Sequence, residues 1–261
     1  MIGHLHSDVF NQQKCLMNGV EMRVRLVKSK DSFCLMDYGN LNAKIHLIEA
    51  NLRVFRVKIS PNILIAHHKA LSRGTAKYPL TRTEIKSFTL HTGVTGETLD
   101  NVIMGQLPKR IILGFVSNKA YNGDFKLNPF NFAHHNLTHL CLYVDGQQIP
   151  SKAIQPDYAN GNFIDAYHTT FSGTGINFGN EGHCISREEY ALGYCLYCFD
   201  LTSDRTAHCT GHWNLIRQGT VRIDVRFSDA LENSLNCVIY TEYDNVLEID
   251  SSRNIIIDYS V

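Results

Sequence analysis

The sequence predicts an all-β fold, an antiparallel jelly-roll sandwich with short helices inserted in long loops. Residues 220–227 alternate between polar and apolar side chains without exception, which is typical of a strand with one buried and one wet face. Residues 235–243 repeat this alternation, which continues through Leu247 and Ile249. Other short apolar runs, separated by turn signals, complete the pattern of a sandwich. The connection 228–234 permits either a hairpin or a crossing between two facing sheets.

Length, charge and cysteine content limit the class of protein. At 261 residues the chain can bury a substantial core, as one large β domain or two small ones, and 25 basic residues balance 25 acidic ones. This balance gives no basic surface for a phosphate backbone, so we expect no specific nucleic-acid partner. No apolar run approaches the roughly 20 residues that cross a bilayer, and residues 1–4 lack the features of a signal peptide. We therefore expect a soluble protein with no membrane partner. The eight scattered cysteines, most of them in apolar runs, predict free thiols and a reducing compartment.

The front of the chain is expected to be extended. Residues 19–26 alternate cleanly, and residues 31–36 form a shorter apolar run before a turn. Residues 44–59 have the pattern of one long strand, whose apolar set changes from even to odd positions near Val54. That change predicts a bulge or a strand that switches sheets.

Residues 60–73 are predicted to form the clearest helix. Ser60 is the expected N-cap, Pro61 suits the first helical position and Gly74 follows as the stop signal. Leu64 and Leu71 share one narrow apolar face, so we expect this helix to lie on the sandwich.

The remaining elements follow from local patterns. The strands are expected at 83–90, 110–116, 137–144 and 194–199, the third closed by the turn at 145–146, with long loops at 117–131 and 200–212. A short amphipathic helix is expected from Phe163 to Gly173, because aromatic residues recur there at helical spacing. Ser186 and Glu189 form a capping box that opens another helix, which Gly193 ends.

The only metal-like spacing in the sequence lies near one strand. It consists of Cys195-x-x-Cys198 followed by Cys209-x-x-His212, with His208 adjacent. Side chains three apart in a strand leave opposite faces, so Cys195 and Cys198 are not expected to share an ion. We therefore predict no bound metal, and leave open whether Cys209, His212 and His208 bind one.

No catalytic or cofactor-binding residue is predicted. The sequence has no Gly-x-Ser-x-Gly, no His-Glu-x-x-His and no glycine-rich phosphate loop between a strand and a helix. Glu181, His183 and Cys184 place a carboxylate, an imidazole and a thiol together, but no oxyanion-hole motif accompanies them.

Two histidine pairs invite a metal or pH-switch interpretation. Neighbours on a helix point about 100° apart, so His67 and His68 cannot share a face, and we expect His68 to be semi-buried and His67 solvated. With His134 and His135 they form the basis of an alternative hypothesis, a pH-dependent assembly switch.

Seven segments, in order along nearly the whole chain, carry a resemblance to a known family. They are DSFCLM at 31–36, VKISP at 57–61, AKYP at 76–79, GQLPKR at 105–110, NPFNF at 128–132, YVDG at 143–146 and EIDSSRN at 248–254. Together they resemble the major capsid protein of Polinton (Maverick) elements and related viruses.

The resemblance implies a structural function. The family protein is a double jelly roll whose trimers tile an icosahedral shell, and this chain resembles its C-terminal portion. Residues 1–43 would be remnant strands of a first jelly roll and residues 44–261 the C-terminal jelly roll, with 221–227 and 235–243 in facing sheets. Residues 1–43 would then be the least stable part of the chain, because strands without neighbours expose backbone groups and an apolar face.

The same resemblance implies partners and a location. The chain, or an endogenised fragment like it, would self-associate, as a homotrimer in the full-length form, and would contact other capsid proteins. It would be a virion protein, found in the cytoplasm or nucleus of the cell. The alternative is a sandwich-type binding module, lectin-like and without catalysis, whose ligand would sit in a discrete polar pocket with a stacked aromatic ring.

Overall fold

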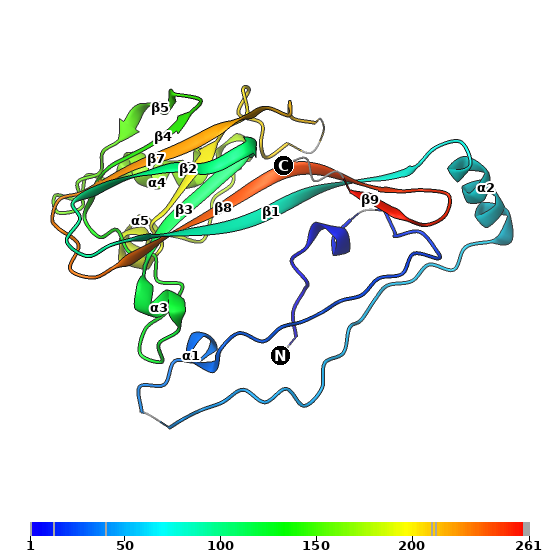
Figure 1. The fold of residues 1–261 in the computed structure, drawn as a ribbon, viewed down its shortest axis with the longest axis horizontal. Helices are drawn as coiled ribbons and strands as arrows, with labels where there is room; N and C mark the ends of the chain where they lie inside the picture. Colours follow the sequence, from blue (N-terminus) through cyan, green and yellow to red (C-terminus); the bar gives the residue numbers. More distant parts are fainter. Residues whose placement is uncertain (1, 13, 40, 210, 212, 258–261) are drawn as a thin grey trace. The chain divides into compact units, whose positions relative to one another are not determined.

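The computed structural model describes residues 2–12, 14–39, 41–209, 211 and 213–257, and within them the chain is a two-sheet β structure. The β8 sheet has the order β1 (Ala76–Leu90), β8 (Leu235–Ile249), β3 (Arg110–Ser117), β6 (Leu196–Asp200), with β9 (Ile255–Ile257) also paired to β8. The β7 sheet has the order β2 (Gly96–Gln106), β7 (Gln218–Phe227), β4 (Leu137–Val144), β5 (Gln147–Ile154) (Figure 1).

The pairing of the strands is that of a jelly roll. β1 lies beside β8, β2 beside β7, β3 beside β6 and β4 beside β5, so the first half of the sandwich is matched in reverse order by the second half. The pairs β2–β7, β3–β6, β3–β8, β4–β5 and β4–β7 are antiparallel. The predicted all-β jelly-roll fold is confirmed.

The core lies between the two sheets and explains the alternation of the strands. Val221 and Ile223 of β7 are fully buried, as are Leu113 and Phe115 of β3 and Ile239 of β8. β7 and β8 belong to different sheets, so the predicted crossing between facing sheets is correct and the hairpin is excluded.

The predicted strands and helices of the sandwich are found within a few residues of their expected bounds, except that β1 begins at Ala76, seven residues before the expected start at 83. The helices are α3 (Asn118–Asn122), inside the predicted loop, α4 (Ile164–Ser172) and α5 (Arg187–Gly193), with the 3-10 turn η2 (Ile176–Gly179). The capping box of α5 is present, because the Ser186 hydroxyl accepts from the Glu189 N–H and the Glu189 carboxylate accepts from the Ser186 N–H. β2, β5 and β9 were not predicted.

The chain divides into two compact units. One comprises Met1–Lys28, Ile45–Arg82 and Asp244–Ser260, and the other comprises Ser29–Lys44 and Thr83–Tyr243 together with the last residue. The sandwich core belongs to the second unit. The first unit has a small core of its own, in which Tyr78, Leu247 and Ile249 pack with partly buried Met17 and Val20.

The first unit contains the predicted helix, with two corrections. α2 spans Pro61–Leu71, with Ser60 at the N-cap position and Ser72 at the C-cap, two residues before Gly74. The helix itself is confirmed. Every residue of α2 before Leu71 is exposed, so it was wrong to expect His68 to be semi-buried. That the helix lies on the sandwich stays a prediction. The apolar face is too narrow to bury more than its last residue.

Three strands expected in the front of the chain are absent among the described residues. Residues 19–26 and 44–59 have no regular secondary structure, and α1 (Asp31–Cys34) replaces the expected strand at 31–36. An alternating pattern provides a face for burial, but a strand also needs a neighbour to take its backbone hydrogen bonds. The 3-10 turn η1 (Asp8–Phe10) lies ahead of these segments. The assignment of residues 1–43 to a first jelly roll stays a prediction.

Candidate functional site: the outer faces of the sandwich

The outer face of the β8 sheet carries a covered ion pair. Arg110 of β3 binds Glu242 of β8 at 2.9 Å, and their side chains are only 12% and 14% exposed. The other two nitrogens of the Arg110 guanidinium also donate hydrogen bonds at the C-terminal end of α4. Nε donates to the Gly173 carbonyl at 2.9 Å and Nη2 to the Thr174 carbonyl at 3.2 Å. A cation at this end of a helix satisfies its free carbonyls and opposes its dipole. Arg110 therefore fastens α4 to the sheet.

α4 also shields the free edge of β6. The Cys198 N–H donates to the Thr169 hydroxyl at 3.3 Å, and the absence of a side chain at Gly173 lets α4 approach so closely that a Cβ there would lie 2.6 Å from Cys198 Cβ. The two edges of the β7 sheet are interrupted in other ways. β5 contains Pro150, which has no N–H, and β2 has a bulge near Asn101, whose φ is 51°. Such devices discourage the addition of a further strand.

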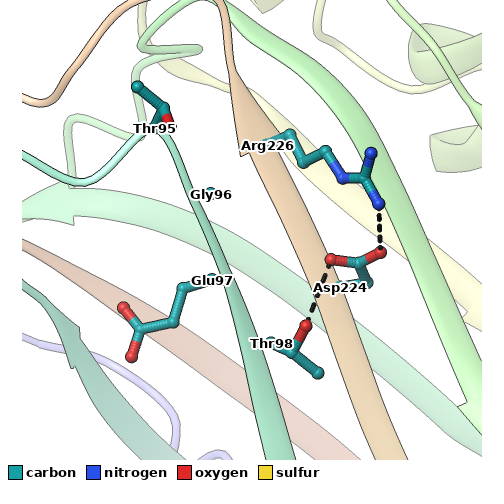
Figure 2. A pocket seen from close by; sticks show the side chains of 6 residues that line it. All are labelled: Thr95, Gly96, Glu97, Thr98, Asp224 and Arg226. Carbon is teal, nitrogen blue, oxygen red and sulfur yellow. Dashed lines mark hydrogen bonds and ion pairs between the residues drawn. The ribbon is translucent and has the colours of Figure 1, made fainter.

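The outer face of the β7 sheet carries an open cluster around Asp224. Arg226 Nη2 lies 3.4 Å from Asp224 Oδ2, and the Thr98 hydroxyl lies 3.4 Å from Oδ1 (Figure 2). His139 Nε2 lies 3.7 Å from the same Oδ2. These contacts are long for charge-assisted hydrogen bonds. The Arg226 side chain is 64% exposed.

A shallow hollow of about 340 Å³ adjoins this cluster. Its described lining residues are Thr95, Gly96, Glu97, Thr98, Asp224 and Arg226, none of them aromatic. Figure 2 shows the Glu97 carboxylate directed away from Asp224, so the two carboxylates do not converge on one ion. The hollow thus offers polar contacts but no nucleophile beside a base.

The zinc-like cysteines point apart, as their spacing predicts. Cys195 belongs to the core and its thiol donates to the Tyr190 carbonyl at 3.1 Å, whereas Cys198 faces α4. Burial raises the pKa of each thiol to about 12, which keeps both protonated and makes them poor ligands. His208 packs on Gly175 and stacks on Phe178 at 5.0 Å.

A metal site is not found in the part of the chain that the structure describes. No three His, Cys, Asp or Glu side chains come together there in a way that would hold an ion. The Cys209 thiol accepts a hydrogen bond from the Gly211 N–H at 3.4 Å, and His212 lies outside the described residues. The expected absence of a metal therefore stays a prediction.

His183 and Cys184 do not form a catalytic pair. The His183 ring stacks on Phe171 at 4.1 Å, and its Nε2 lies 2.7 Å from the Thr170 hydroxyl. Its Nδ1 accepts from the Ile185 N–H at 3.2 Å, so both ring nitrogens are used, whereas Cys184 is exposed. The imidazole has no nitrogen left to take a proton from the thiol.

The histidine pair at 134–135 lies in a tight, aromatic loop. His134 stacks on Tyr158 at 4.2 Å and its Nδ1 accepts from the Asn136 N–H. His135 has a φ of 45°, and its buried Nε2 has no hydrogen-bond partner among the described residues. Burial, and secondarily the charge of His134, lowers the pKa of His135 to about 4. The other pair, His67 and His68, is exposed on α2.

The segments that follow α1 and α3 expose several apolar side chains, which the sequence patterns did not predict. They are Met36, Tyr38, Leu41, Leu127 and Phe130. α1 and α3 are in contact (Figure 1). Phe33 of α1 meets Phe130 edge-on, with 5.7 Å between the ring centroids. The only sequence signal was the pair of aromatic residues in the NPFNF segment of a turn-rich loop.

Comparisons with known proteins found a sequence relative and similar solved structures, all at low identity. No protein-family model matches. An uncharacterized protein from Caenorhabditis elegans is 26% identical over 263 residues, which cover 96% of this chain and 61% of that protein. The chain therefore spans about three fifths of this relative's length.

Solved structures similar to this chain include three from viruses, each matched over 72% of this chain. The Sputnik virophage structure has a TM-score of 0.45, 13% identity and 39% of its chain covered. The PBCV-1 virus capsid has a TM-score of 0.41, 10% identity and 52% of its chain covered. The mavirus major capsid protein has a TM-score of 0.34, 12% identity and 42% of its chain covered.

Proposed function

We propose that this chain is a structural capsid protein of a Polinton/Maverick-like virus or transposon, or an endogenised fragment of one, and that it acts by self-association without catalysis. The observation that carries the proposal is the jelly-roll strand order, found in a chain whose seven family-like segments run through both sheets and their loops. The polar groups that suggested chemistry are engaged in packing: His183 on α4, His208 on η2 and Cys195 in the core.

The exposed front of the chain supports the assignment of residues 1–43 to a first jelly roll. Met22, Val24 and Leu26 are exposed although they alternate as in a strand. The following segment shares this property, with Ile48 98% and Phe55 100% exposed. Apolar surface left in water costs about 25 cal/mol per Å², so a neighbour that covers it would stabilise the protein. Strands of a first jelly roll would supply that neighbour.

In this proposal the full-length form is a homotrimeric tile that meets other capsid proteins in a virion, with the cytoplasm or nucleus as its place in the cell. No described helix has the length and apolar character needed to span a membrane.

The lectin-like alternative gains no support from the hollow beside Asp224, because none of its described lining residues is aromatic.

Particle formation tests the proposal. The protein is expressed with its natural upstream sequence and examined by light scattering and negative-stain electron microscopy, and we expect trimers and pseudo-hexagonal arrays or shells. A parallel glycan-binding assay with the same sample tests the alternative. A monomer that binds a glycan and forms no assembly at any concentration would replace the capsid proposal with the lectin-like one.

A further inference from the structure

β1 ends the β8 sheet, and no strand that the structure describes lies beyond it (Figure 1). The first part of this edge is guarded by side chains. Gln12 donates to the Pro79 carbonyl at 2.8 Å, and proline itself has no N–H. The Thr81 N–H donates to the Asp8 carboxylate at 2.6 Å. This part of β1 therefore offers little to a further strand.

The rest of the edge has no such guard. Backbone groups of alternate residues in a strand point to the same side. The Thr241 hydroxyl of β8 donates to the Glu84 carbonyl, so the even-numbered residues of β1 face β8 and the odd-numbered ones face the free side. From residue 83 onwards the odd-numbered residues are Thr83, Ile85, Ser87 and Thr89. None of these four makes a backbone hydrogen bond outside the sheet in the part of the chain that the structure describes.

The side chains of this part of β1 do not close the edge. An inward lysine often protects an edge strand, but Lys86 donates to the Val102 carbonyl of β2 at 3.2 Å, so its charge is already bound. Ile85 is 67% exposed and uncharged. The Tyr121 hydroxyl of α3 donates to the Ser87 hydroxyl at 3.1 Å, which does not use the Ser87 backbone. Residues 83–89 therefore present a backbone edge to solvent.

A segment with the pattern of a strand but without a neighbour occurs in the same chain. Residues 22–26 have no regular secondary structure. Their apolar side chains alternate with two arginines, and Met22, Val24 and Leu26 are 41%, 42% and 70% exposed. Pairing with a sheet edge would satisfy the backbone of this segment and cover its apolar face.

The two segments match in length and in the character of their faces. Five residues are a typical strand length, and residues 83–89 are long enough to hold them. The even-numbered side chains of β1 face inward, among them Phe88, which packs on the core while partly exposed. An added strand can place its apolar face beside Phe88 and its arginines beside the uncharged outer side chains, where they meet no like charge.

We infer that the edge of β1 at residues 83–89 binds residues 22–26 of a second copy of this chain by strand addition. Within one copy the two segments are not paired, so the second copy supplies the strand. The inference goes beyond the proposed function, because the contact requires neither a shell nor a first jelly roll. In the full-length form a strand of the first jelly roll would compete for residues 22–26. The experiments therefore use the 261-residue chain by itself.

The first experiment separates the backbone of the edge from its side chains. Ile85→Pro removes both the outward N–H and the side chain, whereas the matched control Ile85→Ala removes the side chain and keeps the N–H. Sedimentation velocity is recorded over about three decades of concentration around the micromolar range. We expect self-association to be roughly tenfold or more weaker for Ile85→Pro than for Ile85→Ala. Thermal unfolding checks that both variants are folded.

Hydrogen exchange followed by mass spectrometry tests the contact without a variant. As the concentration of the unaltered chain rises, we expect the amides of residues 22–26 and 83–89 to become protected together. Residues 44–59 are also irregular and mostly exposed, and their exchange should stay constant.

A synthetic peptide of residues 20–28 identifies the added strand. Added to dilute chain, it should protect residues 83–89. The same peptide with Val24→Pro and Arg25→Pro should not, because adjacent residues point to opposite sides and one of the two prolines must remove an N–H that faces β1. This comparison decides the inference if Ile85→Pro does not fold.

The outcomes separate this inference from the proposed function. Equal association of Ile85→Pro and Ile85→Ala, or a chain that is monomeric at every concentration, would reject the edge of β1 as the contact. Protection of both segments that does not depend on concentration would show that residues 22–26 add to their own copy, which also rejects a second copy as the partner. The capsid proposal is decided independently, by the particle experiment on the protein with its upstream sequence.

Discussion

The two outer faces of the sandwich each carry an ion pair, and the two pairs do different things. Arg110 and Glu242 are 12% and 14% exposed and lie under the end of α4, where the arginine also binds two helix carbonyls. Arg226 and Asp224 are 64% and 15% exposed, and nothing that the structure describes binds the arginine more closely than 3.4 Å. A covered charge must be matched by fixed partners, whereas an open one can use water. The covered face therefore determines where α4 lies, and the open face stays free for other contacts.

The largest expected effect comes from removing the anion of the covered pair. Glu242→Gln leaves the Arg110 guanidinium with little solvent and without its counter-charge, and we expect the free energy of unfolding to fall by about 3 kcal/mol. Urea denaturation of the variant and the unaltered protein measures this directly. A loss below about 1 kcal/mol, as at a surface pair, would show that the covered face is not organised by its charges.

A second effect tests whether α4 is seated by shape as well as by charge. Gly173→Ala would place a methyl group 2.5 Å from the Cys198 carbonyl oxygen, so α4 must move away from β6. We expect a loss of roughly 2 kcal/mol, typical of overpacking. Gly182→Ala is the matched control, because a Cβ at Gly182 meets no atom within 4 Å. Equal stability of the two variants would mean that α4 can move away from β6 to accommodate the added methyl group at little cost in free energy.

A third effect concerns a covered group that is neutral at pH 7. The pKa of His135 falls from 6.5 to about 4 in the folded protein because of burial. A lowered pKa means that folding excludes the proton, so the full stability is present above about pH 6.5 and is lost as the pH falls from there towards 4. Allowing for partial exposure, we expect a loss on the order of 2 kcal/mol over this window.

The variant His135→Asn isolates this titration. Asparagine tolerates the left-handed backbone at this position, where φ is 45°, and it does not titrate. Unfolding by urea between pH 4 and pH 7 should therefore be flatter for the variant. The same substitution at exposed His91 serves as the control and should leave the pH profile unaltered. A profile for His135→Asn that matches the unaltered protein would remove His135 as the cause.

The strands of the core could be predicted from the sequence because burial of one face imposes a period of two. β7 shows this without exception, in β8 the odd positions form the more buried set, and both strands were found. β2 was missed because its bulge between Leu99 and Ile103 shifts the period, and β5 because it begins with two glutamines and contains Pro150. Both are edge strands, where the devices that prevent unwanted pairing also erase the pattern.

The surface features could not be predicted in the same way, because they join residues that are distant in the sequence. The spacing of Cys195, Cys198, Cys209 and His212, with His208 adjacent, suggested zinc. The partner of His208 is instead Phe178, some thirty positions earlier. The edge-on contact of Phe33 with Phe130 likewise joins residues that are distant in the sequence. Residues 19–26 show the converse error, since an alternating pattern without a neighbour predicted a strand that the structure does not contain.

The smallest expected effect is on the open face, and it tests the comparison most closely. Asp224→Asn should lower the free energy of unfolding by less than about 1 kcal/mol, because Arg226 can exchange its carboxylate partner for water and the Thr98 and His139 contacts are long. A double-mutant cycle with Arg226→Gln isolates the pair, and its coupling should be within about 0.5 kcal/mol of zero. The cycle at Arg110 and Glu242 provides the reference from the covered face. If the coupling free energy of Asp224 and Arg226 proves as large as that of Arg110 and Glu242, the exposed ion pair also stabilises the fold. The exposed fraction of the side chains would then not predict how much an ion pair of this sandwich contributes to stability.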